Sequence, residues 1–163
     1  MDRGAARLLM PPEQFGSDLQ DAGLTPGRLL ALAKCYGVSR EAVAVNAVQR
    51  WREPAAVAFV RFALRPTTRT VDLRREAPRW RVERAFHGEG FPLFLHRGLA
   101  FADDGAVARA ARAECEVGAE ELVGKDRPVW CRVVARPLGR AGVEVPGVMA
   151  VVSPTPPPAA ART

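Results

Sequence analysis

The side chains best suited to bind a metal are two histidines and three cysteines. His87 and His96 are nine residues apart, whereas a helical H-E-x-x-H zinc site places its two histidines on one face of a helix, one turn apart. Cys35, Cys115 and Cys131 form no C-x-x-C pair. These spacings predict no metal site in this chain, and they predict that the cysteines are reduced and mostly buried.

Motifs for other chemistry are missing from the sequence as well. Gly88 and Gly90 give only a Gly-x-Gly pattern, without the third glycine and the following helix that a dinucleotide site requires. We find no nucleophile elbow and no phosphate-binding loop. Because no set of nucleophile, acid, base and metal can be assembled, we expect no catalytic residues and no activity from this chain alone.

Composition places the chain among folded proteins and leaves its charge open to two interpretations. The 163 residues are 48% hydrophobic and carry a net charge of +6, with basic residues that are nearly all arginine. Residues 1–80 hold 13 basic and 8 acidic side chains, so any contact with nucleic acid belongs to the first half. The arginine bias is equally typical of a genome's base composition. We find no apolar run long enough to span a membrane and no secretory signal, which predicts a cytoplasmic protein.

The first third of the sequence predicts paired helices. A short helix is expected over 12–19. Thr25 and Pro26 are typical of a helix start, and Gly37 is suited to the left-handed conformation that follows a helix end. Ser39 then caps a second helix over 40–52. Two helices joined by a short turn form a helix-turn-helix-like pattern.

The second of these helices carries the candidate contacts with DNA or a protein partner. Its polar residues include side chains able to hydrogen-bond base edges, namely Arg40, Asn46, Gln49 and Arg50. The alternative is a packed helix pair whose polar face is only solvated. The sequence does not decide between them.

The rest of the chain alternates short apolar segments with one helix. Strands are predicted over 55–64, 79–86, 129–136 and 145–152, and a helix capped by Asp103-Asp104-Gly105 over 106–114. This order predicts an α+β fold with a small antiparallel sheet.

The sequence therefore divides into three parts. These are the helical segment 1–54, the α+β unit 55–153 and a disordered Pro- and Ala-rich tail over 154–163. Aromatic residues of the α+β unit could line a small-molecule sensor pocket or form ordinary core: Trp80, Phe86, Phe91, Phe94 and Trp130.

A string of residues near the N-terminus resembles the ImmA/IrrE (M78-type) metallo-endopeptidase family. In that family a helix ending in Leu-Leu-Met-Pro leads into a helix pair with a Val-Ser turn, as in Leu8-Leu9-Met10-Pro11 and Val38-Ser39 here. The α+β unit resembles the GAF-type sensor domain of longer members. The resemblance covers about positions 5–50 and, less specifically, the later unit.

The resemblance implies a zinc enzyme whose metal-binding part is not in this chain. The family's H-E-x-x-H motif is absent, and its glutamate ligand would fall upstream of Met1, so we expect the chain to open within a helix that begins earlier. Such a chain would be the non-catalytic regulatory part, without a cofactor of its own, that recognises a transcriptional repressor in stress-response or mobile-element control. The alternative is a DNA-binding transcription regulator with a ligand-sensing domain. The oligomeric state stays open.

Overall fold

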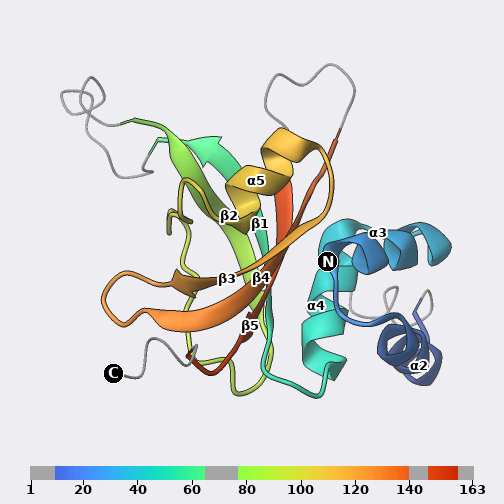
Figure 1. The fold of residues 1–163 in the computed structure, drawn as a ribbon. Helices are drawn as coiled ribbons and strands as arrows, with labels where there is room; N and C mark the ends of the chain where they lie inside the picture. The colour runs from blue at the N-terminus through green and yellow to red at the C-terminus, as the bar shows by residue number, and fades with distance from the viewer. Residues whose placement is uncertain (1–9, 65–76, 140–146, 158–163) are drawn as a thin grey trace.

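The protein is an antiparallel sheet with helices on both faces, as the computed structural model in Figure 1 shows for residues 10–64, 77–139 and 147–157. Within these ranges three helices come first, and one more lies between the second and third strands. The helices are α2 (Pro12–Ala22), α3 (Pro26–Cys35), α4 (Arg40–Arg50) and α5 (Ala106–Ala113). The strands are β1 (Ala56–Ala63), β2 (Arg79–His87), β3 (Val117–Val123), β4 (Val129–Pro137) and β5 (Val148–Pro154). The predicted α+β class is confirmed.

The strand order of the sheet is β2-β1-β5-β4-β3, and every neighbouring pair is antiparallel. The last strand therefore lies in the middle, between the hairpin of β1 and β2 and the hairpin of β4 and β3. Ala56 on β1 pairs with Val152 on β5, residues from the two ends of the α+β unit.

The predicted starts of α3 and α4 are confirmed by their caps. The Thr25 hydroxyl accepts a hydrogen bond from the Arg28 amide at 3.4 Å, and the Ser39 hydroxyl accepts one from the Ala42 amide at 3.1 Å. Each hydroxyl satisfies an amide that has no partner within its helix. Gly37 has φ +61°, the left-handed conformation expected between the two helices.

The predicted start of α5 at Ala106 is confirmed, but neither Asp103 nor Asp104 caps the helix. The N-cap residue is Gly105, and no side chain of the cap residue bonds the helix. Instead Glu121 of β3 accepts a hydrogen bond from the Ala106 amide at 3.1 Å, and Asp103 pairs with Arg79 at 3.1 Å. Burial raises the pKa of Glu121, while the Ala106 amide opposes the rise. A carboxylate from a neighbouring strand thus replaces the local cap.

Strand β3 was not predicted from the sequence. Its seven residues, Val-Gly-Ala-Glu-Glu-Leu-Val, include glycine and two glutamates, which are depleted in strands. Its side chains alternate between half-buried and exposed along most of the strand. Pairing with β4 from Val117 to Val123 forms the strand despite its poor local propensity.

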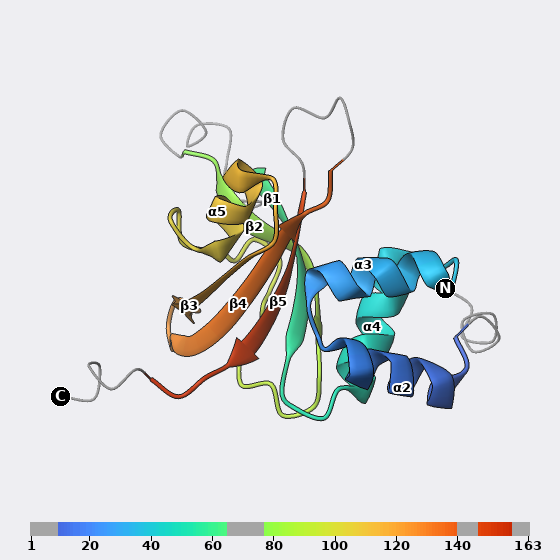
Figure 2. The same ribbon diagram turned by 45° about the vertical axis from the view of Figure 1, so that its right-hand side comes forward.

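Each face of the sheet has its own core, and Figure 2 shows α5 and helices α2–α4 on opposite sides of the sheet. The α5-side core contains the buried residues on the face that α5 covers, including Ala58, Val133 and Ala150. The helix-side core lies between α2–α4 and the opposite face, where Phe59 and Met149 contact the helices. Because strand residues alternate between faces, β1 and β5 contribute to both cores.

The helical segment is joined to the sheet by more than this core. Glu116, just before β3, accepts a hydrogen bond from the Gly27 amide in the first turn of α3 at 2.6 Å. The boundary expected at residue 54 falls between α4 and β1, but the helix-side core crosses it.

At the other end of the chain, Pro154 ends β5, and the Thr155 amide donates to the Trp130 carbonyl at 2.9 Å. The sheet thus continues past the start of the predicted tail, whose residues 158–163, like Leu8 and Leu9 near the N-terminus, lie outside the described residues. None of the helices in the described ranges is long and apolar enough to cross a membrane.

Candidate functional site: a polar groove between α2 and α4

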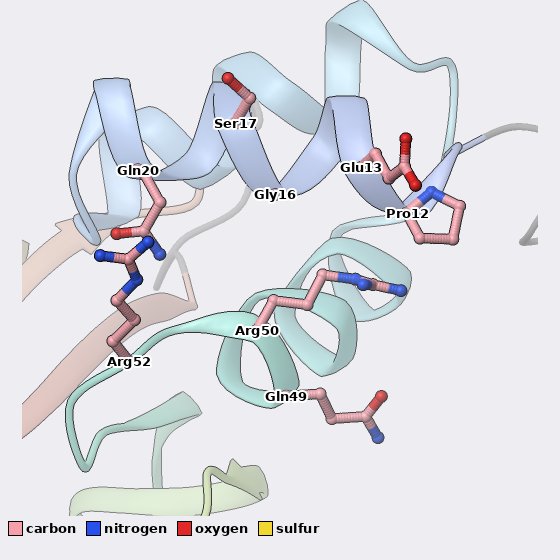
Figure 3. A pocket seen from close by; sticks show the side chains of 8 residues that line it. All are labelled: Pro12, Glu13, Gly16, Ser17, Gln20, Gln49, Arg50 and Arg52. Carbon is pink, nitrogen blue, oxygen red and sulfur yellow. The ribbon is translucent and has the colours of Figure 1, made fainter.

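A polar groove of about 550 Å³ lies between α2 and the C-terminal end of α4 (Figure 3). One wall comes from α2 and the other from α4 and the residues just after it. The lining residues are Pro12, Glu13, Gly16, Ser17, Gln20, Gln49, Arg50 and Arg52.

The wall from α2 is the outward face of an amphipathic helix. Phe15 and Leu19 are fully buried in the helix-side core. Glu13, Ser17 and Gln20 lie on the other side of the helix, where the 3.6-residue period directs them to solvent. Burial of the two apolar side chains therefore leaves this polar face exposed beside the C-terminal end of α4, where it lines the groove.

The wall from α4 depends on where that helix ends. The Trp51 amide donates to the Ala47 carbonyl at 2.8 Å, and Trp51 itself has extended backbone. Arg50 is half-buried and Arg52 is exposed. Figure 3 shows Arg52 extending toward Gln20 of α2, while Arg50 points toward the end of the groove at Pro12 and Glu13.

The side chains of the groove offer hydrogen bonds that the described residues do not use. Arg50, Arg52 and Glu13 form no ion pair within the described ranges. Guanidinium groups present several donors in a fixed plane and favour carboxylates and other oxyanions. With the amides of Gln20 and Gln49 beside them, the groove suits a polar or acidic side chain of a partner.

The four predicted contact residues of α4 are divided between different surroundings. Gln49 and Arg50 line the groove. Arg40 is exposed at the opposite end of the helix. The Asn46 amide donates to the Ala42 carbonyl of its own helix at 2.9 Å, which occupies one of the donors needed to read a base edge.

The sequence did not single out the α2 wall or Arg52. The signal was present, because polar or small residues recur at positions 13, 16, 17 and 20, the helical spacing of one face. Only the packing of α2 against α4 shows that this face meets Gln49 and Arg50.

The aromatic residues proposed as a sensor pocket lie on both faces of the sheet. Trp80 and Phe91 belong to the α5-side core, whereas Phe86 packs against the helix-side core, with its ring 6.2 Å from that of Phe59. Phe94 is 76% exposed. Trp130 is half-buried. Its neighbour Cys131 lies in the α5-side core, and successive strand residues point to opposite faces, so Trp130 lies on the helix-side face of β4. The described residues therefore do not bring these five rings into one cavity.

His87 has a structural contact, and His96 lies in a loop. The Leu95 amide donates to His87 Nε2 at 3.0 Å, and the His87 ring stacks on the Phe94 ring with the two ring centroids 5.3 Å apart. Burial lowers the pKa of His87, which favours the neutral ring that accepts this bond. Within the described ranges no three His, Cys, Asp or Glu residues lie together as a metal site.

All three cysteines are free, but the expectation that they are mostly buried is wrong. Cys35 and Cys115 are exposed, and only Cys131 is buried. Burial, with a further contribution from nearby Glu121, raises the pKa of Cys131 to about 11. Cys131 is therefore an unreactive core thiol. Cys35 lies at the last residue of α3 and Cys115 just after α5, where helix ends meet solvent.

In comparisons with protein families and with curated protein sequences, no family model and no curated sequence matches this chain. The resemblance to ImmA/IrrE peptidases therefore stays a prediction that rests on the residues quoted for it.

Proposed function

We propose that this chain is the non-catalytic regulatory part of an ImmA/IrrE-like metallopeptidase, and that it recognises a transcriptional repressor through the α2–α4 groove. In this proposal zinc and the peptidase motif belong to the full-length family and not to this chain. The sheet with α5 is its GAF-like unit, and α3 with α4 is its helix-turn-helix-like segment.

The groove is the observation that carries the proposal. It combines the family-like helical segment with polar side chains that form no ion pair with other described residues, of which Arg50 and Arg52 are the charged donors. Arginines set in a partly buried groove are frequent anchors of protein interfaces, since their long side chains contribute apolar contact as well as hydrogen bonds. A helix or loop of a partner with a carboxylate side chain would fit between α2 and α4.

The packing of α4 favours a protein partner over DNA. Glu41 on α4 approaches Arg84 of β2 at 4.0 Å, and α4 packs against both β1 and β2. A recognition helix must present a long face to the major groove, whereas the middle of α4 holds half-buried Val45 and Asn46.

Titration with purified repressors tests the proposal. Helix-turn-helix repressors encoded in the same genome would be added singly to the fluorescently labelled chain, with anisotropy as the readout. We expect one of them to bind, and the double variant Arg50→Ala with Arg52→Ala to weaken that binding at least about tenfold, the loss of about 1.4 kcal/mol or more that hot-spot arginines give.

The matched control is Arg97→Ala, which removes an exposed arginine from the loop after β2. This variant should bind the repressor with unchanged Kd. Failure of every repressor to bind, or equal binding by the groove variant, would contradict the proposal.

DNA binding remains the second candidate, because Arg40 and Gln49 are exposed on α4. If α4 reads DNA, a labelled duplex should bind the chain, with an affinity that falls steeply as salt rises. Arg40→Ala would then weaken binding to DNA while leaving any binding to a repressor intact. Absence of binding at low salt removes this candidate.

A further inference from the structure

The two edges of the sheet are protected differently. The outer edge of β2 is covered by the segment that follows it. The Val82 amide donates to the Leu99 carbonyl, the Gly98 amide to the Val82 carbonyl, and the Phe101 amide to the Trp80 carbonyl, all at 2.8–2.9 Å. The outer edge of β3 has no strand beside it within the described residues. An uncovered edge presents backbone donors and acceptors to any extended chain.

The register identifies which groups of β3 face outward. Because the Thr155 amide donates to the Trp130 carbonyl, Trp130 and every second residue of β4 bond toward β5. The residues between them, such as Cys131, bond toward β3. Their register partners on β3, such as Glu121, therefore bond toward β4. The amides and carbonyls of Gly118, Glu120 and Leu122 therefore point away from the sheet.

A side-chain contact agrees with this assignment. The Arg109 side chain of α5 donates a hydrogen bond to the Gly118 carbonyl at 3.3 Å. A carbonyl that pointed toward β4 would be occupied by the sheet, so this bond indicates that the Gly118 carbonyl points outward. The remaining outward groups are the Gly118 amide and both backbone groups of Glu120 and Leu122. They provide five hydrogen-bonding groups for an added strand.

The charge along this edge is opposite to that of the whole protein. Residues 114–121 contain four glutamates and no lysine or arginine, in a chain of net charge +6. Glu116 is bound to the Gly27 amide and Glu121 to the Ala106 amide. Glu120 is exposed and makes no ion pair within the described residues, although Arg132 lies opposite it on β4.

An apolar side chain lies beside this carboxylate. Leu122 is 50% exposed and shares the helix-side face of β3 with Glu120, two residues away. Its register partner is the half-buried Trp130. Helices α2 to α4 pack over β1, β2 and β5, with α3 also in contact with β4, but they leave the end of β3 and β4 at the turn that joins these strands uncovered (Figure 2).

We propose that the outer edge of β3 binds an extended segment of a partner protein as an additional strand, with a basic residue opposite Glu120 and an apolar residue opposite Leu122. The backbone groups supply affinity, and the alternation of charge and apolar contact supplies specificity. The surface is separate from the α2–α4 groove, since no residue of β3 lines that groove.

The charge on β3 argues against a second copy of this chain as the occupant. In an antiparallel pair of β3 strands centred on Glu120, the two Glu120 carboxylates would face each other, and like charges directly opposite are destabilising. A basic partner strand instead pairs the unused carboxylate.

Peptide binding measured by fluorescence anisotropy tests the proposal. The probe is a capped, labelled peptide with the core Thr-Val-Thr-Arg-Thr, which in the antiparallel direction places valine opposite Leu122 and arginine opposite Glu120. We expect saturable binding, and about tenfold weaker binding when the arginine of the peptide is replaced by glutamate.

Backbone methylation separates strand addition from simple charge attraction. N-methyl groups on the valine and arginine amides of the peptide should abolish binding, because these amides point at β3. N-methyl groups on the flanking threonine amides should leave it unchanged. On peptide binding, the amides of Glu120 and Leu122 should gain protection from hydrogen exchange, while those of Ala119 and Glu121, already bonded to β4, should not.

Variants of the protein complete the test. Glu120→Lys should weaken binding of the arginine peptide about tenfold. Glu114→Lys makes the same charge change outside the strand and should have no more than a small effect. The proposal is overturned if the peptide does not bind, if methylation at either set of amides gives the same result, or if light scattering shows a dimer that Glu120→Lys changes.

Discussion

The two faces of the sheet are both covered by helices, but they are filled in different ways. The α5-side core is rich in small residues, with Ala106, Ala108 and Ala110 of α5 against alanines and valines of the strands. The helix-side core uses large side chains such as Phe15 and Leu29. Small residues let a helix approach the sheet closely, whereas large ones fill the space under a three-helix layer. The two faces should therefore respond in opposite ways to changes in side-chain volume.

The largest effect is expected from truncating the helix side. Phe15 is fully buried, and its ring meets that of Tyr36 edge-on at 5.6 Å. Phe15→Ala should lower the free energy of unfolding by about 3–5 kcal/mol, the transfer and cavity cost of a core aromatic. Urea denaturation checks this value. Phe94→Ala is the control, because its side chain is 76% exposed and should cost far less.

The same experiment tests whether the two cores unfold together. Trp80 lies in the α5-side core, so its fluorescence, isolated by replacing Trp51 and Trp130 with phenylalanine, reports the face remote from Phe15. If the faces form one cooperative unit, fluorescence and far-ultraviolet circular dichroism should show the same shifted midpoint in Phe15→Ala. Separate transitions would show that the helical layer unfolds by itself.

Enlargement should be most damaging on the α5 side. Ala110 is fully buried on α5, and Ala110→Leu forces extra volume between this helix and the sheet. We expect a loss of about 1–3 kcal/mol from overpacking. The control is Ala113→Leu at the exposed end of the same helix. Equal stability of the two variants in thermal unfolding would mean that the α5 side has spare volume and that the comparison fails.

A smaller difference is expected at the helix caps. Ser39→Ala removes the hydroxyl that bonds the Ala42 amide and should cost about 1 kcal/mol. Asp104→Ala, before α5, should change stability little, because the start of α5 is bonded by Glu121 and not by a local aspartate. Chemical denaturation of both variants measures the contrast, and a larger loss in Asp104→Ala would refute the assignment of Glu121.

The smallest effect is a pH dependence confined to the α5 side. His87 accepts the Leu95 amide while neutral, and burial lowers its pKa from the ordinary value of 6.5. As pH falls below about 6.5, the unfolded chain takes up a proton more readily than the folded one, so stability is lost until the folded-state pKa is reached.

A pH series of unfolding free energies measures this loss. His87→Phe should flatten the profile in that window, at the expense of an unpaired Leu95 amide. His96→Gln leaves the Leu95 hydrogen bond in place and should keep the fall. A profile that is unchanged in His87→Phe would assign the loss to other groups.

How much the sequence could predict differs between the same two regions. The helices of the first third were predicted to within a few residues, because Thr25, Pro26 and Ser39 are local signals that act on the nearest turns. Most strands were located from their apolar runs. Strand β3 and the Glu121 cap were missed, since both depend on partners distant in sequence.

The candidate site was predicted in part for the same reason. Gln49 and Arg50 were singled out from their types and their helix. Arg52 and the face of α2 could be joined to them only through packing, which no local pattern encodes. The division of the aromatic residues between two faces likewise followed from the registers of different strands.

The position of β5 has a consequence for folding during synthesis. Although it is the last described strand, it pairs with both β1 and β4 and contributes to both cores. A nascent chain that lacks β5 holds two hairpins with no strand to join them. The ribosome must therefore deliver residues 148–154 before either core closes, and until then the facing edges of β1 and β4 are open to other chains. The central strand of this sheet is therefore the last of the described strands to be synthesised, and closure of both cores depends on it.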